Sequence, residues 1–206
     1  MSIPYTRDMR NSVEATKGLR RQAEILVVAR QLLVEEGYDR FVLREIAARA
    51  GMTLGNLQYY FRTREALIGA LAHAESEADR KVLEEILDGR RSGDGRLTEL
   101  TRSLLKRWSG DGGKVYAVAL LLSLSQTPFR DVQRQIYERF YEQLLPILTE
   151  LTPGSRRSVL LDKARLITAL LDGALIQLHN GAPSATTKSQ EHFIDRIASQ
   201  VVTIAR

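Results

Sequence analysis

The sequence predicts an all-α protein, in which a three-helix module at the N-terminus is joined by a long helix to a larger helical body. Apolar residues recur every three or four positions along most of the chain, which is the period of an amphipathic helix. No segment shows the apolar and polar alternation of a half-buried strand, and glycine or proline separates the periodic stretches. We therefore expect two domains, residues 1–64 and 65–206.

The N-terminal module begins with a predicted helix from Leu19 to Glu36, and Gly37 is its expected stop. Its inward face carries five apolar side chains: Ile25, Val28, Ala29, Leu32 and Leu33. The preceding segment, Met1 to Lys17, is polar and charged, so we expect it to form a basic N-terminal arm.

Residues 43–64 predict two short helices joined by a tight turn, the pattern of a helix-turn-helix. From Leu43 to Ala50 the apolar residues form one stripe along a helix. Gly51 suits the left-handed position that follows a helix, because glycine takes this conformation without a side-chain clash. The Thr53 hydroxyl can then cap the next helix.

The second of these helices has an apolar side and a polar side. Leu57 and Phe61, four residues apart, face inward. The other residues of the helix then face outward or lie at its margin: Gly55, Asn56, Gln58, Tyr59 and Tyr60. Asn56 and Gln58 carry the paired donor and acceptor that adenine recognition uses, and Arg44 on the preceding helix could reach a guanine.

Further residues of the module suit contacts to phosphate. The phenols of Tyr59 and Tyr60 can donate to phosphate oxygens, and Thr63 and Arg64 stand at a helix N-terminus, where free amides favour an anion. The alternative is that Tyr60 packs in the core of the module and that Arg49 and Arg62 are solvated.

The rest of the chain predicts a long helix and several shorter ones. Thr63 is a plausible cap for the long helix, which ends at Gly89 and would reach roughly 38 Å at about 1.5 Å per residue. Residues 89–95 predict an exposed loop, and Pro146 is expected to kink or end its helix early. The remaining predicted helices are Leu97 to Trp108, Lys114 to Gln126 after a glycine break at 110–113, a segment opened by Thr127-Pro128, Arg156 to His179, and Glu191 to Ala205.

The net charge of +5 is unevenly distributed along the chain. Residues 1–64 hold 11 Lys and Arg against 7 Asp and Glu, whereas residues 65–206 hold 19 against 18. A basic module attached to a nearly neutral body is typical of phosphate binding at one end, because Lys and Arg displace condensed counterions from nucleic acid. A chance asymmetry of surface charge is the alternative.

In its helix-turn-helix region the chain resembles the tetracycline-repressor family of transcriptional regulators. From Ile25 to Leu71 the motifs of that family appear in order, over about a quarter of the chain. They are Gly37-Tyr38, Ile46-Ala47, Ala50-Gly51, Gly55 with Leu57, Tyr60-Phe61, Arg64 and Leu67. The resemblance implies base contacts at Arg44, Asn56 and Gln58, a palindromic double-stranded DNA operator, a homodimer, and repression relieved by a small-molecule effector.

The chain departs from the family pattern at three places. Phe41 and Val42 stand where the family usually has threonine or serine, so the helix that follows lacks its usual side-chain cap. Gln58 replaces a frequent tyrosine and changes the expected base preference, because an amide pairs with adenine as a phenol does not. Arg64 replaces a frequent lysine and keeps its charge.

The body offers candidates for a dimer interface and for an effector pocket. Two apolar stripes could form a four-helix bundle with a second copy, or could belong to the core of the monomer. Their residues are Leu160, Ala164, Ile167, Leu171, Ala174, Leu178, Phe193, Ile197 and Val201. The pocket candidates are Trp108, Tyr116, Phe129, Tyr137, Tyr141 and His179, and for each of them a place in the core is the favoured alternative. The scarcity of candidates for buried charge favours an apolar or aromatic effector.

Other classes of protein fit the sequence less well. The chain has no cysteine, and His73, His179 and His192 show no ligand spacing, so we expect no enzyme, no metal site and no cofactor. Acidic residues near His73 are better explained as a charged helix face. The longest apolar run is too short to span a membrane, and the absence of an apolar leader agrees with a cytoplasmic location. A helical adaptor that binds proteins through the basic module is the alternative function.

Overall fold

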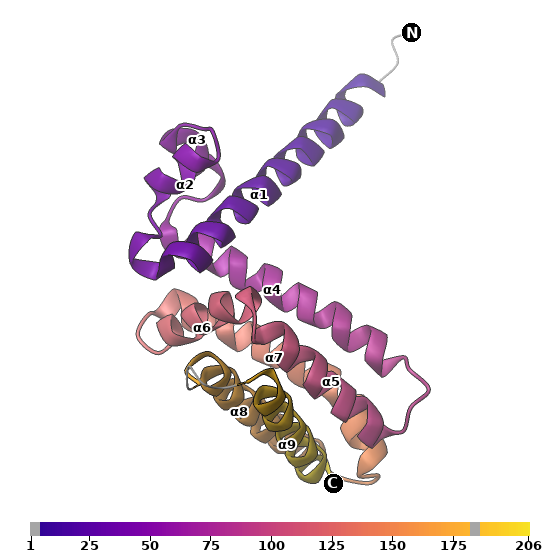
Figure 1. The fold of residues 1–206 in the computed structure, drawn as a ribbon. Helices are drawn as coiled ribbons and strands as arrows, with labels where there is room; N and C mark the ends of the chain where they lie inside the picture. Colours follow the sequence, from indigo (N-terminus) through magenta and orange to yellow (C-terminus); the bar gives the residue numbers. More distant parts are fainter. Residues whose placement is uncertain (1–4, 182–185) are drawn as a thin grey trace. The chain divides into compact units, whose positions relative to one another are not determined.

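A computed structural model describes the chain over residues 5–181 and 186–206, with side chains described from residue 17 (Figure 1). Over these residues it contains nine α-helices and no strand, which confirms the predicted all-α class. The helices are α1 (Tyr5–Arg40), α2 (Leu43–Arg49), α3 (Leu54–Tyr60), α4 (Arg64–Leu87), α5 (Gly93–Trp108), α6 (Asp111–Ser123), α7 (Thr127–Leu151), α8 (Arg157–His179) and α9 (Thr187–Ala205).

The contacts of the chain divide it into two compact units. Unit 1 comprises residues 1–71 and unit 2 comprises residues 72–206. The division falls inside α4, so this helix contributes its first two turns to unit 1 and the remainder to unit 2. Each unit has its own apolar core.

Unit 1 is a small helical module in which α2 packs against both α1 and α3 (Figure 1). Its fully buried side chains come from these three helices, from the link between α1 and α2, and from the start of α4: Ile25, Ala29, Leu32, Phe41, Ile46, Leu57, Leu67 and Ile68. Gly37 has a positive φ of 77° and interrupts the helical path of α1, as the sequence predicted.

The predicted N-terminal arm is helical over the residues of it that the structure describes. Residues 5–17 continue α1 as helix, whereas residues 1–4 lie outside the described residues. Between Tyr5 and Lys17 the sequence contains no proline or glycine to stop a helix that runs on to Gly37.

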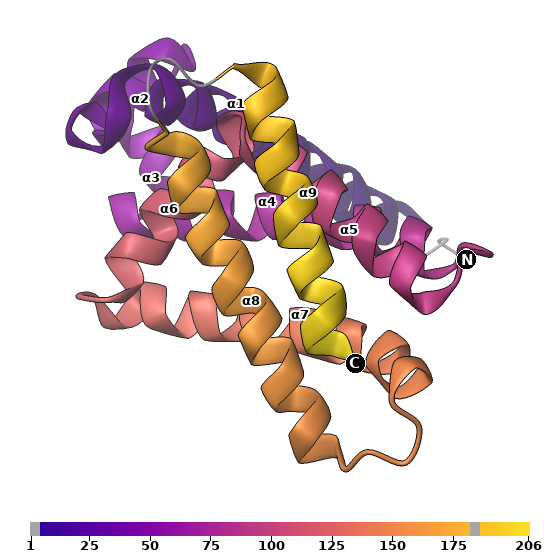
Figure 2. The same cartoon turned by 60° about the horizontal axis from the view of Figure 1, so that its bottom comes forward.

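Unit 2 is built around α5, which contacts each of α6, α7, α8 and α9. The buried face of α5 repeats every three or four residues through Leu97, Leu100, Leu104 and Trp108, so one helix can supply the centre of the core. Helices α8 and α9 lie side by side and run antiparallel (Figure 2).

Helix α6 of unit 2 extends through residues that the sequence assigned to a break. Helix α6 begins at Asp111 and includes Gly112 and Gly113, which are buried rather than exposed in a turn. A Cβ atom on Gly113 would lie 1.8 Å from the carbonyl oxygen of Trp108 and 2.7 Å from Nε2 of His179. These glycines therefore permit close packing instead of ending a helix.

Helices α5 and α7 show the same kind of difference. Ser92 caps α5 by accepting a hydrogen bond from the Gly95 amide. The last residues of the predicted loop therefore belong to the helix. Pro146 does not end α7, which continues to Leu151. The residues on both sides of Pro146 are buried, and we attribute the continuation to this packing, which offsets the missing backbone hydrogen bond.

We predict that Gly113→Ala lowers the free energy of unfolding of unit 2 by about 3 kcal/mol, because its Cβ would overlap backbone that cannot move alone. Urea denaturation followed by circular dichroism measures this. Gly18→Ala is the matched control, since no atom lies within 4 Å of its added Cβ. That substitution should raise stability by about 0.5–1 kcal/mol. Equal effects of the two substitutions would contradict the packing role of Gly113.

Candidate functional site

The turn between α2 and α3 has the geometry that the sequence predicted. Gly51 has a φ of 63°, and its amide donates to the Ala48 carbonyl over 3.1 Å. The Met52 amide donates to the Ala47 carbonyl over 3.0 Å, so the last carbonyls of α2 are satisfied. Thr53 then caps α3, its Oγ1 accepting from the Asn56 amide over 3.2 Å.

Helix α3 is held by its apolar side and leaves its polar side in solvent. Leu57 is completely buried, and Phe61 directly after the helix is buried as well. The side chains of Asn56 and Gln58 are exposed together with Gly55, and Tyr59 is 82% exposed. The structure therefore brings these predicted contact residues onto one accessible surface.

Two further predicted contact residues are accessible, and a third is half-buried. Arg44 is exposed on α2, which has no side-chain cap at Val42, as its sequence indicates. Thr63 is exposed, and its hydroxyl accepts from the Ala66 amide over 3.1 Å at the start of α4. Tyr60 is half-buried, with its ring edge-to-face against that of Tyr59 at 5.1 Å between centroids.

Arg64 has a structural partner that the sequence did not predict. Its guanidinium lies over the ring of Tyr38, 3.6 Å from the centroid, and Nη2 donates to the Tyr38 carbonyl. The cation thus fixes the start of α4 against the end of α1. Arg49 is exposed, as the alternative reading has it, and it also forms ion pairs with Glu36 and Glu45.

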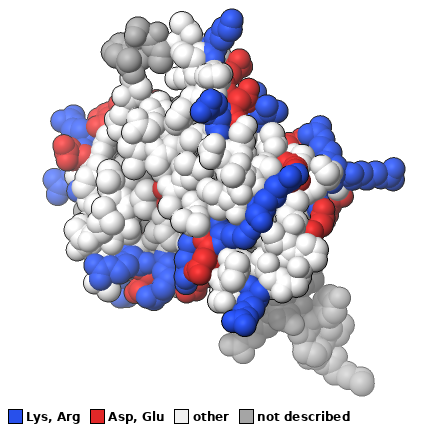
Figure 3. Space-filling view, turned by 90° about the horizontal axis from the view of Figure 1, so that it is seen from below, with Lys and Arg blue, Asp and Glu red and all other residues white. Residues whose placement is uncertain are grey.

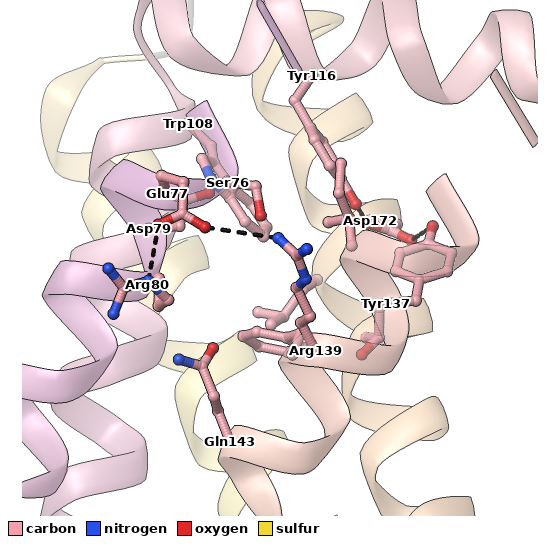
Figure 4. A pocket seen from close by; sticks show the side chains of 14 residues that line it. Ser76, Glu77, Asp79, Arg80, Trp108, Tyr116, Tyr137, Arg139, Gln143 and Asp172 are labelled. Atoms are coloured by element: carbon pink, nitrogen blue, oxygen red, sulfur yellow. Dashed lines mark hydrogen bonds and ion pairs between the residues drawn. The ribbon is translucent and has the colours of Figure 1, made fainter. Parts of the chain in front are cut away.

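Unit 2 contains a narrow cavity of about 570 Å³, including its opening (Figure 4). Helices α4, α5, α6, α7 and α8 all contribute to its wall. The lining residues are Ser76, Glu77, Asp79, Arg80, Trp108, Tyr116, Ile136, Tyr137, Arg139, Phe140, Gln143, Thr168, Leu171 and Asp172.

Asp172 on α8 is the centre of a polar network in this wall. The Tyr137 hydroxyl donates to one carboxylate oxygen, and the Tyr116 hydroxyl lies 3.4 Å from the other. Gln133 supports Tyr116 from a buried position, its Nε2 donating to the phenol oxygen over 2.8 Å. Burial raises the pKa of the Asp172 carboxyl to about 6, and the two phenol hydrogen bonds offset this only in part.

The predicted pocket residues divide into three groups. Trp108, Tyr116 and Tyr137 line the cavity, and Tyr141 lines an open groove on the other side of Tyr137. Phe129 is buried in the core, and His179 bonds through Nε2 to the Trp108 carbonyl over 2.7 Å, so neither lines the cavity. Sequence reasoning missed Asp172, although it is the only charge between Leu166 and Ile176.

The predicted dimer stripe belongs to the core of unit 2. Eight of its nine side chains are buried within the single chain, namely Leu160, Ala164, Ile167, Leu171, Ala174, Leu178, Ile197 and Val201. Phe193 is half-buried. These eight side chains lie on α8 and α9. They are not available to a second copy, because other helices of the same chain already cover them. The large apolar side chains exposed on α8 are Val159, Leu166 and Ile176.

The acidic residues near His73 do not form a metal site. No cluster of His, Asp and Glu suited to a metal ion occurs in the part of the chain that the structure describes. Glu75 and Asp79 both pair with Arg107 on α5, and Trp108 Nε1 donates to Asp79 over 2.9 Å. The carboxylates thus connect α4 to α5 rather than lying on an exposed helix face. No helix of the described residues is long and apolar enough to cross a membrane.

Comparison with known proteins places the strongest similarity in unit 1. Residues 25–71 match the model of the family described as bacterial regulatory proteins, tetR family. A curated HTH-type transcriptional regulator of Xanthobacter autotrophicus is 39% identical over 62 residues, which are 29% of this chain and 31% of that protein. The chain thus matches less than a third of the length of this relative. The match to a family of regulatory proteins agrees with the expectation that the chain is not an enzyme.

Solved structures share the fold along most of the chain. A transcriptional regulator from Rhodococcus sp. superposes with a TM-score of 0.73 at 17% identity, over 88% of this chain and 96% of that one. A regulator from Saccharomonospora viridis in complex with choline superposes with a TM-score of 0.68 at 19% identity, over 87% and 92% of the two chains. Both are similar to this chain in fold.

The raised pKa of Asp172 predicts a pH-dependent effect of Asp172→Asn on stability. The folded carboxyl binds a proton more tightly than the unfolded one, so its contribution is lost as pH rises through about 6. The asparagine variant avoids this loss and should exceed the parent by about 1–3 kcal/mol at neutral pH, but not below about pH 4. Tyr116, Tyr137 and Tyr141 face the carboxyl and stay neutral across this range.

Urea denaturation at several pH values measures the difference. Asp162→Asn is the control, because Asp162 is an exposed carboxylate of the same helix that pairs with Arg165. A difference between the Asp172→Asn variant and the parent that does not change with pH would contradict the assignment.

Proposed function

Because the chain belongs to the tetR family of bacterial regulatory proteins, we propose that it regulates transcription by binding double-stranded DNA through unit 1. The exposed polar side of α3 is the observation that carries this proposal. A short helix held only by Leu57 and Phe61 presents Asn56, Gln58 and Tyr59 to solvent together. Such a helix fits the major groove, where base edges are accessible.

We assign separate tasks to the side chains of unit 1. Asn56 and Gln58 read adenine through paired hydrogen bonds, and Arg44 reads guanine from α2. Tyr59, Tyr60 and Thr63 contact phosphates and fix the register on the duplex. Arg64 supports this surface through its contact with Tyr38, in addition to supplying positive charge. The excess of Lys and Arg in residues 1–64 supplies the non-specific attraction.

We propose that the protein binds as a homodimer, because one α3 reaches only one half-site of a palindromic operator. The exposed apolar residues of α8 support this. Val159, Leu166 and Gly173 follow one another at intervals of seven residues along its outer side, with Ile176 beside them. No atom lies within 4 Å of a Cβ built on Gly173, so a second helix could approach closely. Figure 3 shows the face that carries α8 and α9, where uncharged side chains cover a broad area.

We further propose that the protein is a cytoplasmic repressor controlled by a small-molecule effector in the cavity of unit 2. A dimer on an operator blocks access to the promoter, and a ligand that prefers another spacing of the two DNA-binding units weakens this binding by its differential affinity. The aromatic wall formed by Trp108, Tyr116 and Tyr137 supports an effector with an apolar or aromatic body. The choline complex of a protein with the same fold gives further support.

An electrophoretic mobility shift with the DNA that flanks the gene tests the proposal. A regulator should give a complex whose affinity falls steeply with salt and survives an excess of unrelated DNA. A helical adaptor for proteins should give no complex with any duplex. Selection of bound fragments from genomic DNA then supplies the operator sequence.

We predict that Gln58→Ala costs about 1–3 kcal/mol of binding free energy on the operator and relaxes base preference at one position of each half-site. The loss follows from the missing base contact, so binding to unrelated DNA should change little. Fluorescence anisotropy at one fixed salt concentration measures both affinities. Gln31→Ala is the matched control, since Gln31 is an exposed glutamine on α1 that bonds only to Glu35. An operator affinity unchanged by Gln58→Ala excludes the proposed readout.

We predict that Leu166→Glu converts the dimer into a monomer at micromolar concentration, because two carboxylates would meet in an apolar interface. Sedimentation velocity measures the change. Leu121→Glu alters an equally exposed leucine on α6 and should leave the dimer intact, since Leu166 is 58% and Leu121 61% exposed. If both variants remain dimers, the interface lies elsewhere.

A further inference from the structure

We propose that the cavity of unit 2 binds an organic cation, a protonated amine or a quaternary ammonium group on an apolar or aromatic body, with the cation beside Asp172. The proposal rests on the proposed function, because it specifies the chemical class of the effector. It follows from a carboxylate without a counter-charge, the aromatic groups around it, and the pairing of the other charges in the wall.

The first observation is that Asp172 has no cationic partner among the described residues. Its carboxylate accepts hydrogen bonds from Tyr116 and Tyr137, both of which are neutral donors. Hydrogen bonds from phenols stabilise a carboxylate but do not cancel its charge. A half-buried carboxylate without a counter-charge is costly and gains most from a ligand that carries a positive charge.

The second observation is that aromatic rings form the wall near this carboxylate. Trp108 and Tyr116 stack with 5.5 Å between ring centroids and an interplanar angle of 12°. Tyr137 and Phe140 line the cavity from α7. Ring faces attract cations through their quadrupole, and most strongly where water is excluded. The same wall would repel a carboxylate or phosphate through Asp172.

The third observation is that every other charge in the wall is already paired. Asp79 pairs with Arg107, and Glu77 pairs with Arg80 and with Arg139. Glu77 and Arg139 are both well exposed and lie at the solvent side of the cavity. A ligand can therefore enter by displacing flexible side chains at the opening, and the charge it meets inside is that of Asp172.

The position of Asp172 explains how such a ligand would be sensed. The carboxylate on α8 is bonded to phenols on α6 and α7, so a cation inserted here contacts three helices of unit 2 at once. Helix α8 also carries the apolar residues that we propose for the dimer interface. Binding at Asp172 is thereby connected through one helix to the proposed contact between two copies.

The test uses Trp108, the single tryptophan of the chain, whose fluorescence reports directly on the cavity. The full-length protein is titrated with three probes of similar size: benzyltrimethylammonium, benzyl alcohol and benzoate. We expect the cation to bind about tenfold or more tightly than the neutral and anionic probes, because only the cation compensates Asp172. Asp172→Asn should weaken binding of the cation about tenfold and leave binding of benzyl alcohol unchanged.

Asp162→Asn removes an exposed carboxylate from the same helix and should leave all three affinities unchanged. The inference is overturned if benzoate or benzyl alcohol binds the parent as tightly as the cation, if the cation does not bind, or if Asp172→Asn binds it unchanged. DNA affinity of the same samples without probe is measured separately. Loss of cation binding with intact DNA binding contradicts only this inference, whereas absence of DNA binding contradicts the proposed function.

Discussion

The burial of Leu57 determines what unit 1 presents to a partner. Helix α3 has two turns, too few to be stable without packing, and Leu57 is its only completely buried side chain. Because side chains of a helix point in fixed directions, fixing Leu57 inward also fixes Asn56, Gln58 and Tyr59 outward. Gly51 and Thr53 then set where this helix begins. The surface that we assign to DNA is thus a direct result of one apolar anchor and one tight turn.

Within unit 2, ion pairing distinguishes the carboxylates that stabilise the fold from the carboxylate that we assign to ligand binding. Arg107 lies between Glu75 and Asp79 and connects α4 to α5, so these carboxylates are occupied in holding the fold. Asp172 has a comparable position in the cavity wall but only phenols as partners. A half-buried carboxylate without a cation lowers stability, and sites of this kind are usually kept for binding. Asp79 and Asp172 therefore look alike in the sequence and differ in their surroundings.

The sequence predicted local structure well where a single residue type determines the backbone. Gly37, Gly51 and Thr53 adopt the conformations that their chemistry favours, and the alternation of buried and exposed residues in α3 follows from Leu57 and Phe61. It failed at Gly113, because a glycine needed for close packing and a glycine that ends a helix look the same without tertiary contacts.

Predictions about surfaces and sites needed the folded chain for a similar reason. An apolar stripe such as the one through Leu160 and Ile197 fits an interface or a core equally, and only the packing of α8 on α9 decides that it is core. The partner of Arg64 is Tyr38, 26 residues earlier, and no local pattern connects them. Asp172 did leave a signal, a lone charge in an apolar helix, but its phenol partners come from two other helices.

The central claim is that α3 enters the major groove once in each half of a palindromic site. The chain has no cysteine, so Tyr59→Cys supplies one thiol, to which an iron chelate that cleaves nearby DNA can be attached. Mapping the cuts on the operator tests the claim most directly. The account predicts two clusters of cuts, separated by about one helical turn (about 10 base pairs) or a multiple of it. Cuts scattered evenly along bound DNA, or no more cuts than the cysteine-free chain gives after the same treatment, would contradict it.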